Sequence, residues 1–138
     1  MRVIVPDASV MLKWVIPTVE EGRDSAIELR DEAIAGKVAL VVPSLWLYEV
    51  ANTLARRFPD QAAQLLDALV AFGLAESAAT KAWREEALAL TRRYDVTFYD
   101  AAYHALALVE RGVFVTADSD YVARAKRAGA VMLLGALP

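Results

Sequence analysis

Hydrophobic positions along the chain form short continuous runs separated by longer, periodically patterned segments. The runs rich in branched apolar residues are 3–5, 38–42, 113–116 and 131–134. Because apolar and polar residues do not alternate within them, these runs predict strands buried on both faces of a sheet. Pro6 and Pro43 follow the first two runs, where a residue without an N–H ends strand pairing. Residues 73–76 predict a further, brief edge strand.

The segments between these strands have the apolar spacing of amphipathic helices. Helices are predicted for residues 20–37, 45–57, 59–72, 79–94, 97–110 and 118–128. Gly36 suits a C-terminal cap, and Ser44 suits the N-terminal cap of the second helix. Strands that alternate with helices favour a parallel sheet with right-handed crossovers, so we expect an α/β fold.

The composition narrows the class of protein. A chain of 138 residues has the size of one domain, and we expect a single domain spanning residues 1–138. The absence of cysteine excludes disulfides, thiolate metal sites and a cysteine nucleophile. There is no signal-peptide pattern and no apolar stretch near the roughly 20 residues that span a bilayer, so we expect a cytoplasmic protein without membrane contact.

The net charge and the mean hydropathy indicate how the protein could bind polyanions and other proteins. The formal net charge is -3, so a polyanion must be bound through a local patch or through metal ions. The mean hydropathy of +0.33 is high for a small domain. We therefore expect another subunit or a partner to cover part of an apolar surface.

Four acidic residues are predicted to lie at one edge of the sheet. Asp7 and Asp118 directly follow strands, and Glu49 and Asp100 lie in the first two turns of crossover helices. The carboxyl ends of parallel strands and the starts of crossover helices share one edge, where α/β folds bind ligands. Carboxylates about 4 Å apart repel by about 4 kcal/mol at an effective dielectric near 20. Such a cluster favours Mg²⁺ or Mn²⁺, and these ions support phosphodiester hydrolysis.

Each of these acids also has a structural interpretation. Asp7 and Asp118 suit helix N-caps, and Thr97 with Asp100 resembles a capping box. Glu49 lies opposite the apolar stripe of its helix, as a solvated side chain would. Unrelated helix caps and surface acids would not be expected to lie together at the carboxyl edge of the sheet, which is called the rim below. Their predicted location there favours a common site.

Four segments resemble PIN-domain ribonucleases, specifically the VapC-type toxins of toxin-antitoxin pairs. They are Val-Pro-Asp-Ala-Ser-Val-Met-Leu-Lys-Trp (5–14), Pro-Ser-Leu-Trp-Leu-Tyr-Glu-Val-Ala-Asn (43–52), Phe-Tyr-Asp-Ala-Ala-Tyr (98–103) and Val-Thr-Ala-Asp (115–118). The resemblance implies a three-layer α/β/α sandwich with a central parallel sheet of four to five strands. It also implies Mg²⁺- or Mn²⁺-dependent cleavage of an RNA substrate and a small antitoxin that blocks the site. Together with the apolar composition, it leads us to expect a homodimer.

The resemblance assigns roles to individual positions. The metal-binding and catalytic set is Asp7, Glu49, Asp100 and Asp118, and the supporting polar positions are Ser9, Asn52 and Thr116. Asp120 lies two residues beyond the last motif, where it would either approach a second ion or serve as a cap.

Other residues have two interpretations each. His104 lies one turn after Asp100 and is either a proton carrier or a packed, hydrogen-bonded ring. Lys13 and Arg56 either contact RNA phosphates or are ordinary solvated charges. We expect the tryptophans in the core or an interface rather than stacked on bases; they are Trp14, Trp46 and Trp83.

Two functions remain in competition. The first is a metal-dependent ribonuclease toxin, and the second is a catalytically silent PIN module that serves as a binding or dimerisation scaffold. Loss of an acidic position would indicate the second, and all four acids are present. The sequence therefore favours the enzyme.

Overall fold

The computed structural model describes residues 1–136. The strands are β1 (Arg2–Pro6), β2 (Val38–Pro43), β3 (Ala75–Ser77), β4 (Val113–Thr116) and β5 (Val131–Leu133). The helices are α1 (Ala8–Leu12), α2 (Arg23–Ile34), α3 (Trp46–Arg57), α4 (Ala62–Phe72), α5 (Lys81–Tyr94), α6 (Phe98–Val109) and α7 (Ser119–Ala125). Two 3₁₀ turns, η1 (Lys126–Ala128) and η2 (Leu134–Ala136), flank β5.

The five strands form one parallel sheet in the order β3-β2-β1-β4-β5. Ile4 of β1 is paired with Leu40 of β2 on one side and with Val113 of β4 on the other. The first strand of the chain is therefore the central strand, and Asp7 leaves the sheet at the middle of its carboxyl edge.

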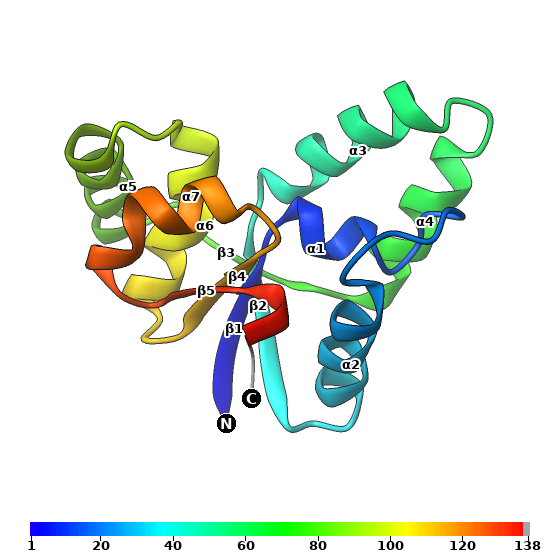
Figure 1. Ribbon diagram of the computed structural model, residues 1–138, viewed down its shortest axis with the longest axis horizontal. Helices are drawn as coiled ribbons and strands as arrows, with labels where there is room; N and C mark the ends of the chain where they lie inside the picture. Colours follow the sequence, from blue (N-terminus) through cyan, green and yellow to red (C-terminus); the bar gives the residue numbers. More distant parts are fainter. Residues whose placement is uncertain (137–138) are drawn as a thin grey trace.

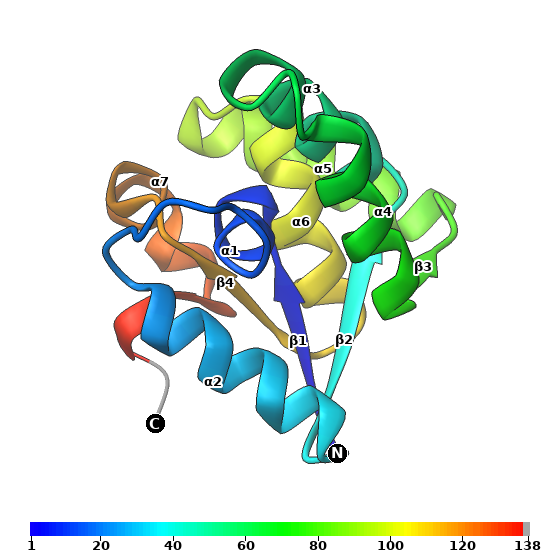
Figure 2. The same ribbon diagram turned by 90° about the vertical axis from the view of Figure 1, so that its right-hand side faces the viewer.

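Helices cover both faces of the sheet. Figures 1 and 2 show α5, α6 and α7 on one face and α1, α2, α3 and α4 on the other. Helix α6 packs across β1, β2 and β4, and its residues from Ala101 to Ala107 are all buried. The predicted three-layer α/β/α arrangement and parallel sheet are confirmed.

The tryptophans belong to this core, as expected. Trp14, Trp46 and Trp83 are buried, and each indole N–H has a partner, which for Trp46 is the Glu76 carboxylate at 3.3 Å. Trp14 donates to the Ala26 carbonyl at 2.8 Å, and Trp83 donates to the Ala102 carbonyl at 2.8 Å. No helix within residues 1–136 is both long enough and apolar enough to cross a membrane.

Several element boundaries differ from the sequence-based expectation. Ser44 does not cap α3, because Leu45 already has helical dihedral angles (φ -64°, ψ -15°) and takes the N-cap position without a side-chain bond. The helix expected over residues 20–37 is shorter, and its N-cap is Gly22 in the left-handed conformation (φ 83°). The last strand ends at Leu133, where a 3₁₀ turn begins. Helix α1 was not predicted, because five residues are too few for a periodic pattern.

Candidate active site

Asp7 lies where the central strand ends and α1 begins. Its carboxylate accepts hydrogen bonds from the Ser9 hydroxyl at 2.5 Å, the Thr116 hydroxyl at 2.6 Å and the Val10 backbone N–H at 3.2 Å. Burial raises the pKa of the Asp7 carboxyl above its ordinary value despite these bonds, and the charge of Asp100 raises it further. Asp7 is thus the N-cap of α1 and also a carboxylate held at the centre of the rim.

Ser9 and Thr116 connect Asp7 to the loop that follows β4. The Ser9 hydroxyl accepts from the Ala117 N–H at 3.1 Å, and the Thr116 hydroxyl accepts from the Asp118 N–H at 3.0 Å. Since each hydroxyl also donates to Asp7, the ends of β1 and β4 are fixed relative to each other. Both residues, which the resemblance gives as supporting polar positions, therefore contact Asp7 directly.

Glu49 is partly buried on α3, so of its two interpretations the solvated side chain is wrong. Its Oε1 atom is buried and has no hydrogen-bond partner within residues 1–136, and the same holds for the Tyr103 hydroxyl. Burial raises the pKa of the Glu49 carboxyl, and the charges of Asp100 and Asp7 raise it further. The Tyr103 hydroxyl is near enough to oppose this rise in pKa, although the two groups do not reach hydrogen-bond geometry.

Asp100 and Asp118 line a shared cleft of about 260 Å³, which Asp120 also lines. The Asp100 N–H is capped by the Thr97 hydroxyl at 3.2 Å, while burial and the charge of Asp118 raise the pKa of the Asp100 carboxyl. Asp118 is the N-cap of α7, and its Oδ1 atom accepts from the backbone N–H groups of Asp120 and Tyr121 at 3.0 and 3.1 Å. The cap interpretation of Asp118 therefore holds, with one carboxylate oxygen committed to it.

The four acids interact electrostatically across the rim. Asp100 raises the pKa of both Asp7 and Glu49, and Asp118 raises that of Asp100. Within residues 1–136, no three carboxylate or imidazole side chains are close enough together to hold a metal ion as they lie. The chemistry of the donor set nevertheless fits one, because it consists of hard carboxylate oxygens and the buried Glu49 Oε1 lacks a protein partner.

The chain matches the PIN domain family over residues 4–127. It belongs to that family. Several solved structures share the fold. VapBC2 from Rickettsia felis, bound to a DNA fragment from its promoter, is 14% identical, with 95% of this chain and 96% of that chain covered and a TM-score of 0.70. VapC20 from Mycobacterium tuberculosis, described as a sarcin-ricin loop cleaving toxin, is 22% identical, with coverage of 93% and 96% and a TM-score of 0.67.

A toxin-antitoxin complex from Klebsiella pneumoniae is also similar to this PIN family member. It is 14% identical, with 95% of this chain and 97% of that chain covered and a TM-score of 0.64. No curated protein matches the chain. Identities this low establish a common fold and leave the activity to be inferred from the site itself.

The other candidate polar residues of this PIN family member differ from the four acids in their burial and contacts. Asn52 and Arg56 are exposed on α3, after Glu49. Lys13 is largely buried and forms an ion pair with Glu20 at 3.0 Å, so it is not an ordinary solvated charge.

His104 is fully buried in α6, between two hydrogen-bond partners. Its Nδ1 atom is 2.7 Å from the Tyr121 hydroxyl, and its Nε2 atom is 2.7 Å from the Gly129 carbonyl. Of the two interpretations of His104, the packed, hydrogen-bonded ring is therefore the one that the structure supports. Tyr103 and Arg124 were not singled out from the sequence, although the first faces Glu49 and the second lines the acidic cleft. Tyr103 lies three residues after Asp100, and that helical spacing was the available signal.

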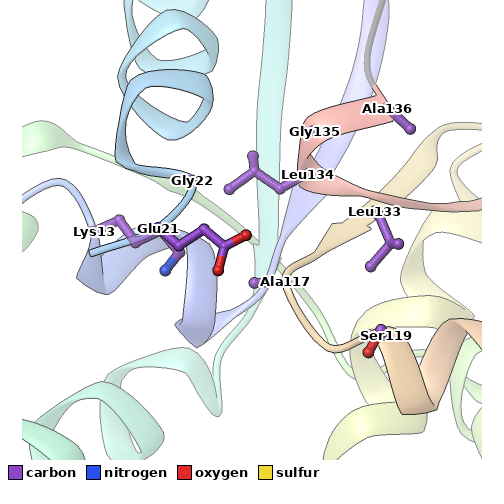
Figure 3. A pocket seen from close by; sticks show the side chains of 9 residues that line it. All are labelled: Lys13, Glu21, Gly22, Ala117, Ser119, Leu133, Leu134, Gly135 and Ala136. Atoms are coloured by element: carbon purple, nitrogen blue, oxygen red, sulfur yellow. The ribbon is translucent and has the colours of Figure 1, made fainter.

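A cavity of about 720 Å³, larger than the acidic cleft, is not lined by any of the four acids. It is lined by Lys13, Glu21, Gly22, Ala117, Ser119 and residues 133–136. Figure 3 shows the side chains of Lys13 and Glu21 on one side of it, with Ser119 and Leu133 on the other. Cavity size alone therefore does not single out the four predicted acids.

Proposed function

We propose that this PIN family member is a divalent-metal-dependent endoribonuclease and acts as the toxin of a toxin-antitoxin pair. The observation that carries the proposal is the gathering of Asp7, Glu49, Asp100 and Asp118 at the carboxyl edge of the sheet. Membership of the PIN domain family supports a nuclease. The names of the structural neighbours, a VapC toxin that cleaves the sarcin-ricin loop and two toxin-antitoxin assemblies, support the toxin role.

The four acids have distinct tasks in this proposal. Asp7, Glu49, Asp100 and Asp118 would hold Mg²⁺ or Mn²⁺, which when bound activates water and neutralises charge on the phosphoryl oxygens. Ser9 and Thr116 keep the Asp7 carboxylate oriented through the bonds at 2.5 and 2.6 Å. Burial is the main cause of the raised pKa values of Asp7, Glu49 and Asp100, and neighbouring carboxylates raise them further, so a bound cation would offset both effects.

A cleavage assay with matched variants tests the catalytic half. Purified protein should cut labelled RNA with Mg²⁺ or Mn²⁺ and stop when EDTA is added. Asp100→Asn should lower the rate by at least about 100-fold, because it removes a charged ligand from the rim. Asp67→Asn, an equal change at an exposed position of α4, should leave the rate unchanged. Cleavage at an equal rate in EDTA would refute the proposal, as would an active Asp100→Asn protein.

The partner half of the proposal is a small antitoxin that covers the rim and a homodimer of the toxin. Large apolar side chains are exposed on the described surface, among them Tyr48 (73%) and Tyr99 (62%), which directly precede Glu49 and Asp100. Co-expression with the product of a short neighbouring reading frame should give a stable complex with suppressed RNA cleavage. Light scattering should give twice the monomer mass for the free toxin at tens of micromolar; a strictly monomeric mass contradicts the dimer.

The alternative of a catalytically silent scaffold makes a different prediction. A silent module would fold and bind a partner but would not cleave RNA with either ion. The presence of all four acids, one with a buried oxygen that no protein group satisfies, favours the enzyme.

A further inference from the structure

A second hollow, of about 440 Å³, lies beside the acidic cleft, between the end of α5 and the segment formed by α7 and η1. It is lined by Arg93, Tyr94, Ala123, Arg124, Lys126 and Arg127. Four of the chain's 15 lysine and arginine residues therefore surround one hollow in a protein whose net charge is -3. These four exposed side chains, Arg93, Arg124, Lys126 and Arg127, are called the basic cluster below.

Helix dipoles explain only part of this arrangement. Arg93 lies in the last turn of α5, and Arg124 lies in the last turn of α7, where cations interact favourably with the helix C-terminus. That interaction explains a cation at the end of each helix. It does not explain why the ends of α5 and α7 lie across one hollow, where their like charges repel. In the described part of the chain, Arg124 is the one member with a carboxylate within 4 Å, that of Asp95 at 3.8 Å. The Asp95 side chain is fully exposed, so solvent screens this pair.

Arg124 joins the basic cluster to the candidate active site. It lines the 440 Å³ hollow and also the acidic cleft that contains Asp100 and Asp118. Its guanidinium donates to the Asp95 carbonyl at 3.0 Å, which fixes it at the turn between α5 and α6. A polyanion that places one phosphate at the acids would therefore meet Arg124 next and the rest of the cluster beyond it.

We propose that the basic cluster binds the phosphate backbone of single-stranded RNA on one side of the bond that is cut. The inference rests on the proposed ribonuclease function. It adds the path that the RNA takes over the protein surface, from the four acids to the basic cluster. In a protein of net negative charge, a local cationic patch helps to retain RNA near carboxylates, and guanidinium groups bind phosphate through two parallel hydrogen bonds. Tyr94 supplies an aromatic ring in the same hollow, on which a base can stack. Stacking of this kind favours RNA over an acidic peptide as the occupant.

Two double variants with the same net charge test this proposal. Lys126→Gln/Arg127→Gln removes two exposed cations that take part in no ion pair or side-chain hydrogen bond within residues 1–136. Arg2→Gln/Lys37→Gln removes two exposed cations at the opposite, amino edge of the sheet. Both changes take the formal charge from -3 to -5, because each removes two positive charges. Any difference between them therefore reports the position of the charge.

The measurement is the fluorescence anisotropy of a labelled single-stranded RNA in EDTA, titrated at several salt concentrations. Loss of two phosphate contacts should weaken binding about tenfold at low salt and reduce the slope of log K against log salt by about 1.4, at about 0.7 per contact. In Mn²⁺ the same variant should raise KM for RNA cleavage with little change in kcat, because the cluster positions substrate away from the reacting atoms. The Arg2→Gln/Lys37→Gln protein should match the wild type in salt slope and KM.

Each other outcome contradicts the proposal in a distinguishable way. If the wild type cleaves RNA with Mn²⁺ and both double variants bind RNA equally, the cluster is not a substrate site, although the ribonuclease function stands. If RNA binding is equal but Lys126→Gln/Arg127→Gln alone loses affinity for poly-glutamate, the cluster is a site for an acidic protein partner. If the wild type neither binds nor cleaves RNA, both proposals fail. Thermal melts of all three proteins establish that each is folded.

Discussion

At the scale of single residues, one carboxylate can cap a helix and also belong to the group of four acids. Asp7 accepts from the Val10 N–H and also from two hydroxyls that tie it to the end of β4. Asp118 commits Oδ1 to the start of α7 while it lines the acidic cleft. The caps fix these carboxylates, so the proposed metal site would not have to order them again when an ion binds.

Glu49 differs from them because one of its oxygens has no protein partner. Its folded pKa lies above the ordinary value, so folding favours the protonated acid and the charged form destabilises the native state at neutral pH. Replacing Glu49 by Gln should therefore raise the free energy of unfolding in EDTA at pH 7 by about 1 kcal/mol, because the neutral amide avoids the cost of desolvating a charge. The gain should disappear below pH 4.5, where the wild-type side chain is itself neutral in both states.

Thermal melts at neutral and acidic pH measure this effect, with Glu28→Gln on the exposed face of α2 as the matched control. Saturating Mn²⁺ should reverse the order at pH 7, because the wild type gains ligand-binding stabilisation of about 2.7 kcal/mol at a hundredfold excess over Kd. A metal response of equal size in both proteins would remove Glu49 from the proposed ligand set.

At the scale of elements, a single glycine controls how α6 leads into β4. A Cβ at Gly112 would lie 2.5 Å from the carbonyl oxygen of Val3 and 2.9 Å from its side chain, so the turn can pass β1 only without a side chain. Gly112→Ala should lower the free energy of unfolding by about 2 to 3 kcal/mol, since the central strand has to shift. Gly135→Ala places its methyl group in open space and should be nearly neutral. Urea unfolding measures the stability of both variants. Equal stabilities would mean that β1 can shift to accommodate the methyl group at little cost.

The elements that the sequence predicted well are those with a long or uniform pattern. The runs at residues 38–42 and 113–116 became β2 and β4 because continuous branched side chains suit a strand covered on both faces. Helix α1 was missed because its pattern is too short. The cap at Ser44 was misplaced by one residue because side-chain preference favours serine, whereas the backbone places Leu45 at the N-cap. The first error concerns a whole short helix and the second the end of a helix, and local pattern is weak in both places.

Strand order explains why the site was predictable only in part. The sequence places four acids at one edge, but only the pairing of β1 between β2 and β4 makes Asp7 the centre of that edge. The inward direction of Glu49 depends on how α3 packs, and so does its proximity to Tyr103. The basic cluster lies between two helices about 30 residues apart in sequence, a relation that no local pattern reveals.

At the scale of the whole molecule, one buried histidine should link global stability to pH. The Gly129 carbonyl can only accept, so His104 Nε2 carries the proton, and Nδ1 accepts from the Tyr121 hydroxyl. The ring thereby joins α6 to α7 and to the turn before β5. Burial lowers the pKa of His104 below 6.5, although the Gly129 bond and the charge of Glu86 oppose this. The unfolded chain thus binds more protons than the native state as the pH falls through 6.5, and stability should be lost there.

His104→Gln provides the test. At pH 7.5 the variant should be less stable than the wild type by about 2 kcal/mol, because the Tyr121 and Gly129 partners are left poorly satisfied in a buried site. The difference should narrow between pH 6.5 and 5, because only the wild type carries the unfavourable cost of a neutral buried imidazole in acid. Urea unfolding in EDTA across this range measures both proteins while the proposed metal site is kept empty. A stability difference that stays constant from pH 7.5 to 5 would mean that His104 protonates in place, with the Tyr121 hydroxyl turning to accept from Nδ1.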